Sequence, residues 1–322
     1  MRLLVPGGFA PMKGLTFWKL AALLLFLILL AFLVPSPNAF AEEIPEYDHS
    51  VLPQFEPVTL ESCDPLPLSG RAPYAASESG YAQEGWEYRD ASLYVKVYEF
   101  RVWDTTVQAA YVQIADASQL RTEQAGRYPS KTTARGDAMA KRSNAVIAVN
   151  ADYFIYHNAG IVYRGGERLR NHASADFDEL VVDTAGNFHM LTPLTQEGFD
   201  AIEEDILVSF CFGPALVVDG EVQEITDRRV TYKSRCGIAQ LGELTYLLVV
   251  TDGDSPGDDP STGLSIPQFA QLMKDLGAVN AYNLDGGLSV TMVFGGSKIN
   301  GNVMHHRPIG DIVYFATAVP DR

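Results

Sequence analysis

The segment NLDGGLSVTMVF, residues 283–294, places an acid and two glycines directly before an apolar, β-branched run. An Asp-Gly pair next to a strand is a strong hairpin signal. Asp285 could equally be a carboxylate held at the edge of a sheet for chemistry. Asp252-Gly253 follows the apolar run LTYLLVVT and has the same two interpretations, whereas Asp219-Gly220 between PALVV and EVQEI is predicted to be a plain hairpin.

The elements around the two open Asp-Gly pairs suggest that they meet. Residues 244–285 are predicted as strand, loop, helix and strand, with the capping box of Ser265 and Gln268 starting the helix and Gly277 ending it. A helix that connects two strands of one sheet makes them parallel, with a right-handed crossover. Parallel strands end at the same edge, so Asp252 and Asp285 are expected at the edge where open sheets bind ligands.

Two further turns should reach this edge. In NAVIAVNADYF a predicted helix, about 133–142, precedes the strand, and Asn150 and Asp152 follow it. The short connection QLGE predicts a hairpin in which Arg235 lies opposite about Val250 and therefore beside the first Asp-Gly pair. Arginine is suited to bidentate recognition of phosphate or carboxylate. A structural ion pair of this arginine with the neighbouring acid is the alternative.

The composition predicts a folded enzyme-sized body. The 322 residues are 47% apolar and 20% charged, which is far from a disordered composition. From Leu93 onward strand-like runs dominate and few gaps can hold a helix. We therefore predict an α+β fold with a mostly β core and a few helices, forming a single domain over 91–322. Residues 42–90 are rich in Pro, Ser, Glu and Gly and are predicted to be a linker or an irregular N-terminal segment; a cleavable pro-segment is an alternative.

The N-terminus has the pattern of a secretory signal peptide. Three basic residues precede a 15-residue apolar run at 20–34, and an Ala-Phe-Ala cleavage pattern follows at 39–41. The run is short for a bilayer span of about 20 residues. Residues 1–41 are therefore predicted to be a signal peptide, with an uncleaved N-terminal anchor as the alternative. Either would place the body outside the cytoplasm, secreted or extracytoplasmic, with membrane contact only through a retained N-terminal segment.

The charge excludes some partners. The chain has 24 basic and 40 acidic residues, a balance of −16, and loss of the N-terminal segment would leave 21 basic residues and a balance of −19. Such a surface argues against nucleic acid or anionic lipid as partner. The three cysteines, Cys63, Cys211 and Cys236, allow at most one disulfide within the chain.

Metal-binding patterns are weak. Asp254, Asp258 and Asp259 resemble a calcium loop in composition, but the EF-hand spacing fails, so no cofactor is predicted and calcium stays an alternative. His305 and His306 are adjacent, and adjacent side chains on an extended chain point to opposite sides. We therefore expect solvated loop histidines there and no metal site.

At these residues the chain resembles the phosphodiester glycosidase family over about 91–319. The resemblance rests on an ordered series of motifs: AVNADYF, FGPALVVDGEV, SRCGIAQ, the long block from LLVVTDGDSPG to NLDGGLSVTMVF, and RPIGDIVYFA. Five positions depart from the family pattern, and they leave the substrate open. They are Asp152 for Gly, Cys236 for Thr, Leu288 for the third Gly, Val290 for the second Ser, and Asp254 where Arg or Gln is frequent.

The family reaction implies hydrolysis of a sugar-1-phosphodiester at the sugar C–O bond. A carboxylate would stabilise the oxocarbenium-like state as nucleophile or through an activated water, with Asp285 as first choice and Asp252 as second. Arg235 and Arg307 would neutralise the departing phosphate. The remaining residues assigned to substrate binding are Asn150, Asp152, Asn283, Gly286, Gly287 and Ser289.

The predicted substrate is a sugar-phosphate or polysaccharide of an envelope or exopolysaccharide type. Two other functions fit the same residues. One is a non-catalytic cell-envelope glycan-binding module, and the other is a phosphodiesterase that cleaves the P–O bond.

Overall fold

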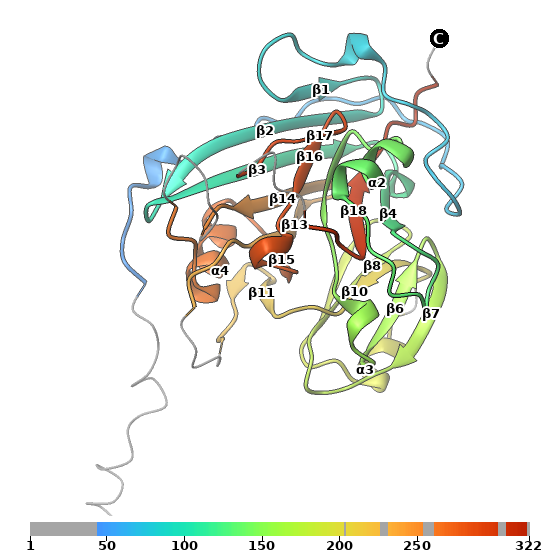
Figure 1. The fold of residues 1–322 in the computed structure, drawn as a ribbon, viewed down its shortest axis with the longest axis vertical. Coiled ribbons are helices and arrows are strands. Elements are labelled where there is room, and N and C mark those ends of the chain that lie inside the picture. The colour runs from blue at the N-terminus through green and yellow to red at the C-terminus, as the bar shows by residue number, and fades with distance from the viewer. Residues whose placement is uncertain (1–43, 203, 226–230, 254–260, 302–306, 321–322) are drawn as a thin grey trace, which may run out of the picture. The chain divides into compact units, whose positions relative to one another are not determined.

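The computed structural model describes residues 44–202, 204–225, 231–253, 261–301 and 307–320. Strands dominate this part of the chain (Figure 1), which confirms the predicted α+β fold with a mostly β core. None of its helices is both long and apolar enough to cross a membrane. The predictions for residues 1–41, for Asp254, Asp258 and Asp259, and for His305 and His306 lie outside the described residues.

Eight strands form the largest sheet, and every neighbouring pair in it is antiparallel. The strands lie in the order β1 (Glu87–Arg89), β2 (Leu93–Val102), β3 (Thr105–Ile114), β14 (Thr245–Thr251), β13 (Cys236–Gly242), β15 (Asn280–Leu284), β11 (Ala215–Val218) and β12 (Glu221–Val222).

The two strands expected to be parallel, β14 and β15, lie on either side of β13. Both pair antiparallel with β13, so they run in the same direction, as predicted, but they are not neighbours. In the β13–β14 hairpin Cys236 pairs with Val250. This register is within one residue of the prediction, which placed Arg235 opposite Val250.

Ten more strands form three smaller sheets. A five-stranded sheet has the order β17 (Ser297–Lys298), β16 (Met292–Phe294), β5 (Ile147–Asn150), β18 (Asp311–Phe315) and β4 (Leu120–Gln124). A three-stranded sheet contains β10 (Ile206–Phe210), β8 (Glu179–Asp183) and β9 (Phe188–Leu191), and a hairpin contains β6 (Gly160–Arg164) and β7 (Glu167–His172). The loop after β15 leads to β16, so Asp285 lies where the chain passes from the eight-stranded to the five-stranded sheet.

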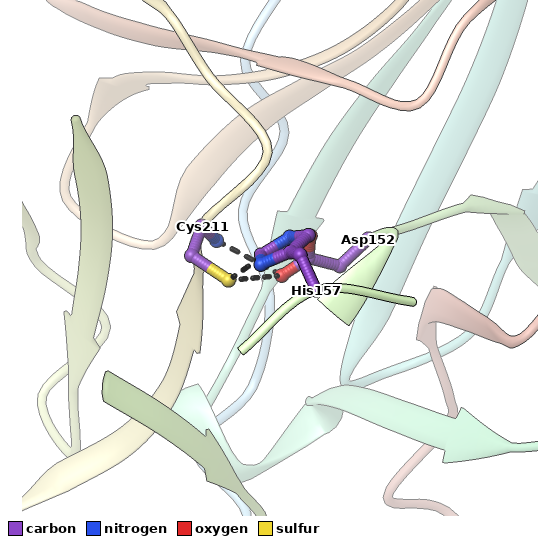
Figure 2. A group of neighbouring side chains, drawn as sticks. All are labelled: Asp152, His157 and Cys211. Atoms are coloured by element: carbon purple, nitrogen blue, oxygen red, sulfur yellow. Dashed lines mark hydrogen bonds between the residues drawn. The ribbon is translucent and has the colours of Figure 1, made fainter. Parts of the chain in front are cut away.

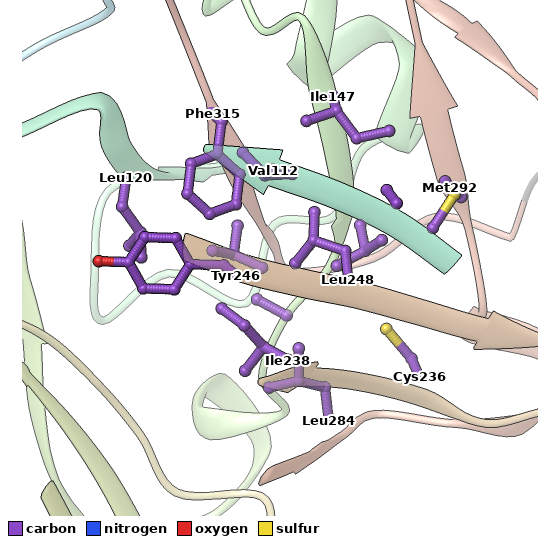
Figure 3. Close-up of a cluster of buried hydrophobic side chains, with 14 of the residues drawn as sticks. Val112, Leu120, Ile147, Cys236, Ile238, Tyr246, Leu248, Leu284, Met292 and Phe315 are labelled. Atoms are coloured by element: carbon purple, nitrogen blue, oxygen red, sulfur yellow. The ribbon is translucent and has the colours of Figure 1, made fainter. Parts of the chain in front are cut away.

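The main core lies between the eight-stranded and the five-stranded sheet (Figure 3). Val112 and Ile238 of the eight-stranded sheet belong to the same buried cluster as Ile147 of β5. The ring of Tyr246 on β14 lies 5.4 Å from that of Phe315 on β18. Burying side chains of this size stabilises the fold by about 1.5–3 kcal/mol each, so the contact fixes one sheet firmly against the other.

The other face of the eight-stranded sheet is covered by α4 (Ile266–Asp275). Ser265 and Gln268 form the predicted capping box, and Gly277 follows the helix at a φ of +89°. The helix predicted at about 133–142 is α2 (Gly136–Arg142). The sequence did not predict α3 (Gln196–Asp200), because five residues are too few to show a helical apolar period. The described residues contain the 3-10 turns η2 (His49–Val51), η3 (Glu78–Gly80), η4 (Ala117–Gln119), η5 (Phe154–Tyr156) and η6 (Gly287–Ser289).

The segment before β1 is irregular but packed against the sheets. The Tyr47 hydroxyl donates to a carboxylate oxygen of Asp275 at 2.8 Å. The ring of Phe55 stacks on that of Tyr111 on β3 at 5.2 Å. In the described part of 42–90 these contacts give an irregular wrap over the sheet that α4 also covers.

Candidate active site

A pocket of about 440 Å³ opens at the edge of the eight-stranded sheet where β13 begins and β15 ends. Six of the ten residues predicted from sequence line it, and they include Asp285 and Arg235. The full lining is Phe212, Thr231, Lys233, Ser234, Arg235, Gly253, Asn283, Asp285, Gly286, Gly287, Leu288 and Arg307.

Strand register brings the arginine and the acid together. Arg235 precedes β13, and its backbone N–H donates to the Thr251 hydroxyl at 2.9 Å. Cys236 also pairs with Leu284 at the end of β15. The residues next to this pair, Arg235 and Asp285, therefore leave adjacent strands at the same edge.

Asp285 is held by its backbone and only half-buried. Its N–H donates to the Ala151 carbonyl at 3.0 Å, and its own carbonyl accepts from the Asn150 amide at 2.5 Å. Burial raises the pKa of Asp285, and a hydrogen bond from Ser289 and the charge of Arg307 lower the same pKa in part. Asp285 is the only carboxylate among the described residues of the lining.

Three basic side chains line the same pocket: Lys233, Arg235 and Arg307. The buried Arg235 guanidinium donates from Nε to the Leu264 carbonyl at 2.7 Å and from Nη2 to the Thr231 carbonyl at 2.5 Å. These bonds fix the position of its charge. The lining thus carries more positive than negative charge in a chain whose balance is −16, which favours an anionic group in the pocket.

Asn283 adds a polar atom with no partner. Its side chain is buried and donates to the Gly213 carbonyl at 2.7 Å. Its side-chain oxygen has no hydrogen-bond partner among the described residues. A buried acceptor of this kind is costly unless a ligand or water satisfies it, so it is suited to a ligand hydroxyl group.

Four predicted site residues do not line the pocket: Asn150, Asp152, Asp252 and Ser289. The Asn150 side chain donates to the Asp285 carbonyl and accepts from the Thr291 N–H at 3.0 Å, so its contacts position the loop. The buried Ser289 contributes its hydroxyl to Asp285. Asp252 lies at the same edge, where its charge raises the pKa of Lys298 against the larger lowering by burial.

The structure explains why glycine occupies both positions after Asp285, which the sequence alone did not show. The Gly287 N–H donates to the Ser234 carbonyl at 2.8 Å, and a Cβ at Gly286 would approach that same carbonyl to 3.0 Å. Gly287 also has a φ of +61°. Close packing of the loop on the start of β13 therefore requires them, and the Gly287 N–H is already used within the protein.

Thr231, Lys233 and Phe212 are among the lining residues that were not predicted from the sequence. A signal was present for two of them, because residues 231, 233 and 235 alternate and side chains at this spacing share one side of an extended chain. Phe212 had no such signal. It reaches the pocket from the loop after β10, which belongs to a different sheet.

Asp152 belongs to a second group, with the half-buried His157 and the buried Cys211 (Figure 2). Its carboxylate accepts from the Cys211 N–H at 2.9 Å and lies 3.5 Å from the Arg164 guanidinium. The Cys211 sulfur lies 4.0 Å from the His157 Nε2 and 3.6 Å from the Arg170 guanidinium.

The three side chains of this group could in principle offer ligand atoms to a metal ion, since these atoms all lie within 4.8 Å of one another. Two guanidinium groups already supply positive charge at the sulfur and the carboxylate, which opposes a metal cation. Burial also raises the pKa of the Cys211 thiol. All three cysteines are free of disulfides, and the structure gives Cys211 a packing and hydrogen-bonding role.

Comparison with known proteins assigns the chain to a family. A model of the phosphodiester glycosidase family matches residues 143–318, more than half of the chain. The chain belongs to the phosphodiester glycosidase family. The matched residues include β13, β15 and all of the pocket lining, and the predicted resemblance is confirmed. No curated protein sequence matches the chain.

The chain is also similar to solved structures. The catalytic domain of zebrafish N-acetylglucosamine-1-phosphodiester alpha-N-acetylglucosaminidase, auto-inhibited by its pro-peptide, matches with a TM-score of 0.56 and 17% identity, over 76% of this chain and 87% of that one. A hypothetical protein from Synechocystis matches at 15% identity over 69% and 62% of the two chains, with a TM-score of 0.46. An exported protein of Burkholderia pseudomallei matches at 15% identity over 66% and 74%, with a TM-score of 0.45. The first likeness shows that this chain shares the fold of the zebrafish domain.

Proposed function

We propose that the protein is a secreted hydrolase that cleaves a sugar-1-phosphodiester at the sugar C–O bond, in an envelope or exopolysaccharide-type glycan. The observation that carries the proposal is the pocket that Asp285 lines together with Lys233, Arg235 and Arg307. Family membership supports the reaction class. The basic and apolar pattern of residues 1–41 supports secretion.

In this mechanism the departing group is a phosphomonoester, which leaves far more readily than an alcohol. Neutralising its charge therefore matters more than protonating it, and Arg235 and Arg307 supply this neutralisation. The sugar carbon becomes oxocarbenium-like, and ionised Asp285 stabilises it as nucleophile or through an activated water. The unpartnered Asn283 oxygen accepts a hydrogen bond from a sugar hydroxyl group.

A direct assay tests the proposal. Purified residues 42–322 are incubated with the methyl phosphodiester of N-acetylglucosamine 1-phosphate, the short probe, whose sugar is taken from the name of the zebrafish relative. A panel of other sugar-1-phosphodiesters is tested in parallel, with and without chelator. Release of free sugar supports the hydrolase. Tight binding of panel members without any product would instead favour the glycan-binding module.

The pH dependence of activity should report on Asp285 and Arg307. Because Asp285 acts ionised and burial raises its pKa, kcat/KM should fall on acidification at a pH above the usual range of an aspartate. Arg307 lowers that pKa, so Arg307→Gln should move the acid limb to higher pH. Loss of its phosphate contact should also reduce kcat/KM by about 10- to 100-fold.

The matched control is Arg142→Gln, which removes an exposed arginine paired with Glu123 at 2.8 Å on another part of the surface. It should leave both the acid limb and kcat/KM unchanged. An acid limb that moves to lower pH in Arg307→Gln would contradict the assigned proximity of this arginine to Asp285.

A further inference from the structure

Three aromatic side chains form a ledge that continues from the pocket. Phe212 lines the pocket, and its ring lies 6.5 Å from that of Tyr153 in an edge-on arrangement. The Tyr153 ring lies 4.5 Å from that of Tyr156, with 30° between the ring planes. The aromatic ledge is therefore defined by Phe212, Tyr153 and Tyr156.

Exposure of large apolar side chains is concentrated around this pocket. Six such side chains are exposed in the described part of the chain, and three of them lie in the pocket lining or on the ledge. Leu288, 53% exposed, lines the pocket. Tyr153 and Tyr156 are 38% and 43% exposed on the ledge. An apolar concentration of this kind marks a binding surface, whereas scattered exposed residues do not.

Buried neighbours and hydrogen bonds hold the turn that carries Tyr153 and Tyr156. Phe154 and Ile155, between them in the chain, are buried. The Arg170 guanidinium donates to the Phe154 carbonyl at 2.8 Å and to the His157 carbonyl at 2.7 Å. The tyrosine rings thus project outward from a fixed backbone, and a ligand that stacks on them need not order the turn first.

Charge distinguishes the ledge from the pocket. The pocket gathers three basic side chains, whereas the ledge consists of aromatic rings without a formal charge. An aromatic ring has a negative face, which attracts the polarised C–H bonds on the apolar face of a sugar ring. Phosphate suits the pocket, and an uncharged sugar ring suits the ledge.

We propose that the aromatic ledge binds a neutral saccharide ring one or more units away from the cleaved bond, so that the substrate is an oligosaccharide or polysaccharide. This inference rests on the proposed hydrolase function, because it treats the ledge as an extension of the substrate site. It names a substrate class: a glycan chain that carries its phosphodiester next to neutral sugars. A densely anionic polymer fits poorly, because the chain has a balance of −16.

The test compares the short probe with a long probe, the methyl 1-phosphodiester of the β-1,4-linked N-acetylglucosamine trimer. The wild type should have a higher kcat/KM on the long probe. Tyr153→Ala/Tyr156→Ala should lose about tenfold on the long probe and less than twofold on the short one. The matched control, Tyr153→Phe/Tyr156→Phe, keeps both rings and should retain the wild-type preference. Equal melting temperatures exclude unfolding as the cause.

A binding measurement separates this inference from the proposed function. Isothermal titration of Asp285→Asn protein uses phosphate-free trisaccharides built from N-acetylglucosamine, glucose, mannose or xylose, with and without the two alanine substitutions. Binding that the alanine substitutions abolish supports the ledge even if neither probe is hydrolysed, in which case the hydrolase proposal alone fails. An unchanged probe preference together with unchanged or absent trisaccharide binding would overturn the ledge. Binding to phosphatidylcholine vesicles in place of every sugar would also overturn it.

Discussion

Asp285→Asn is expected to lower kcat on a sugar-1-phosphodiester by roughly 10³-fold or more, with little change in stability. The substitution removes the charge that stabilises the oxocarbenium-like state in the proposed mechanism but keeps the shape of the side chain. The backbone bonds of Asp285 to Ala151 and Asn150 do not involve the carboxylate. The amide oxygen of asparagine can still accept a hydrogen bond from the Ser289 hydroxyl group. Steady-state kinetics and thermal unfolding measure the two effects.

A matched control is available in Asp219→Asn. Asp219 also stands in an Asp-Gly pair, at a φ of +51° in the turn between β11 and β12, and asparagine tolerates that conformation. This variant should keep full activity. Asp252→Asn is measured in the same assay and compared with Asp285→Asn, because Asp252 is the second candidate for the catalytic carboxylate and does not line the pocket. Normal turnover by Asp285→Asn, or its unfolding, would contradict the role of Asp285.

Arg164→Met is expected to destabilise the fold by about 3–5 kcal/mol, because it leaves two buried carboxylates without their cation. The Arg164 guanidinium lies 2.9 Å from the Asp311 carboxylate and 3.5 Å from that of Asp152, and all three side chains are buried. It also lies 4.5 Å from the centre of the Phe154 ring. Denaturant unfolding with matched m-values gives the difference in unfolding free energy.

The pH dependence separates lost charge from lost packing. Burial raises the pKa of Asp311 to about 6 even with Arg164 present. Without the arginine, the folded-state pKa of this carboxyl rises further above its unfolded value. The variant therefore keeps its stability below the pKa of Asp311 in the unfolded chain. It loses stability as the pH rises through the pKa of Asp311 in the folded protein. The penalty should therefore be larger at pH 8 than at pH 5.

The exposed pair of Arg142 and Glu123 gives the comparison for an ion pair at the surface. Arg142→Met should cost less than about 1 kcal/mol at either pH. Arg164→Met should also reduce activity, because the Asp152 N–H donates to Asp311 and the adjacent Ala151 carbonyl accepts from Asp285. A penalty for Arg164→Met as small as that for Arg142→Met would show that the buried carboxylates do not depend on this cation.

Local signals predicted the part of the site that strand pairing builds. A four-residue connection fixes a hairpin, and a capped helix between two strands fixes their direction, so Arg235 and Asp285 could be placed at one edge from sequence. The predicted edge is correct although β13 separates the two strands. Register errors of one residue do not move a loop to another edge.

Long-range packing decided what the sequence could not show. Asn150 lies at the expected place, but its amide is used by the Asp285 carbonyl and the Thr291 N–H, two groups about 140 positions further along the chain. Asp152 follows the same strand, yet the loop turns it toward Arg164 of β6 and Asp311 of β18. No local period encodes contacts between different sheets. The sequence therefore could not show that both side chains bind other parts of the protein.

Hydrolysis in water enriched in oxygen-18 tests the central claim most directly. Water attacks the sugar carbon if Asp285 and the basic side chains stabilise C–O cleavage, so mass spectrometry should find the label in the released sugar and none in the phosphomonoester. Label in the phosphate would mean that the P–O bond breaks, and the account of this pocket as a phosphodiester glycosidase site would be wrong.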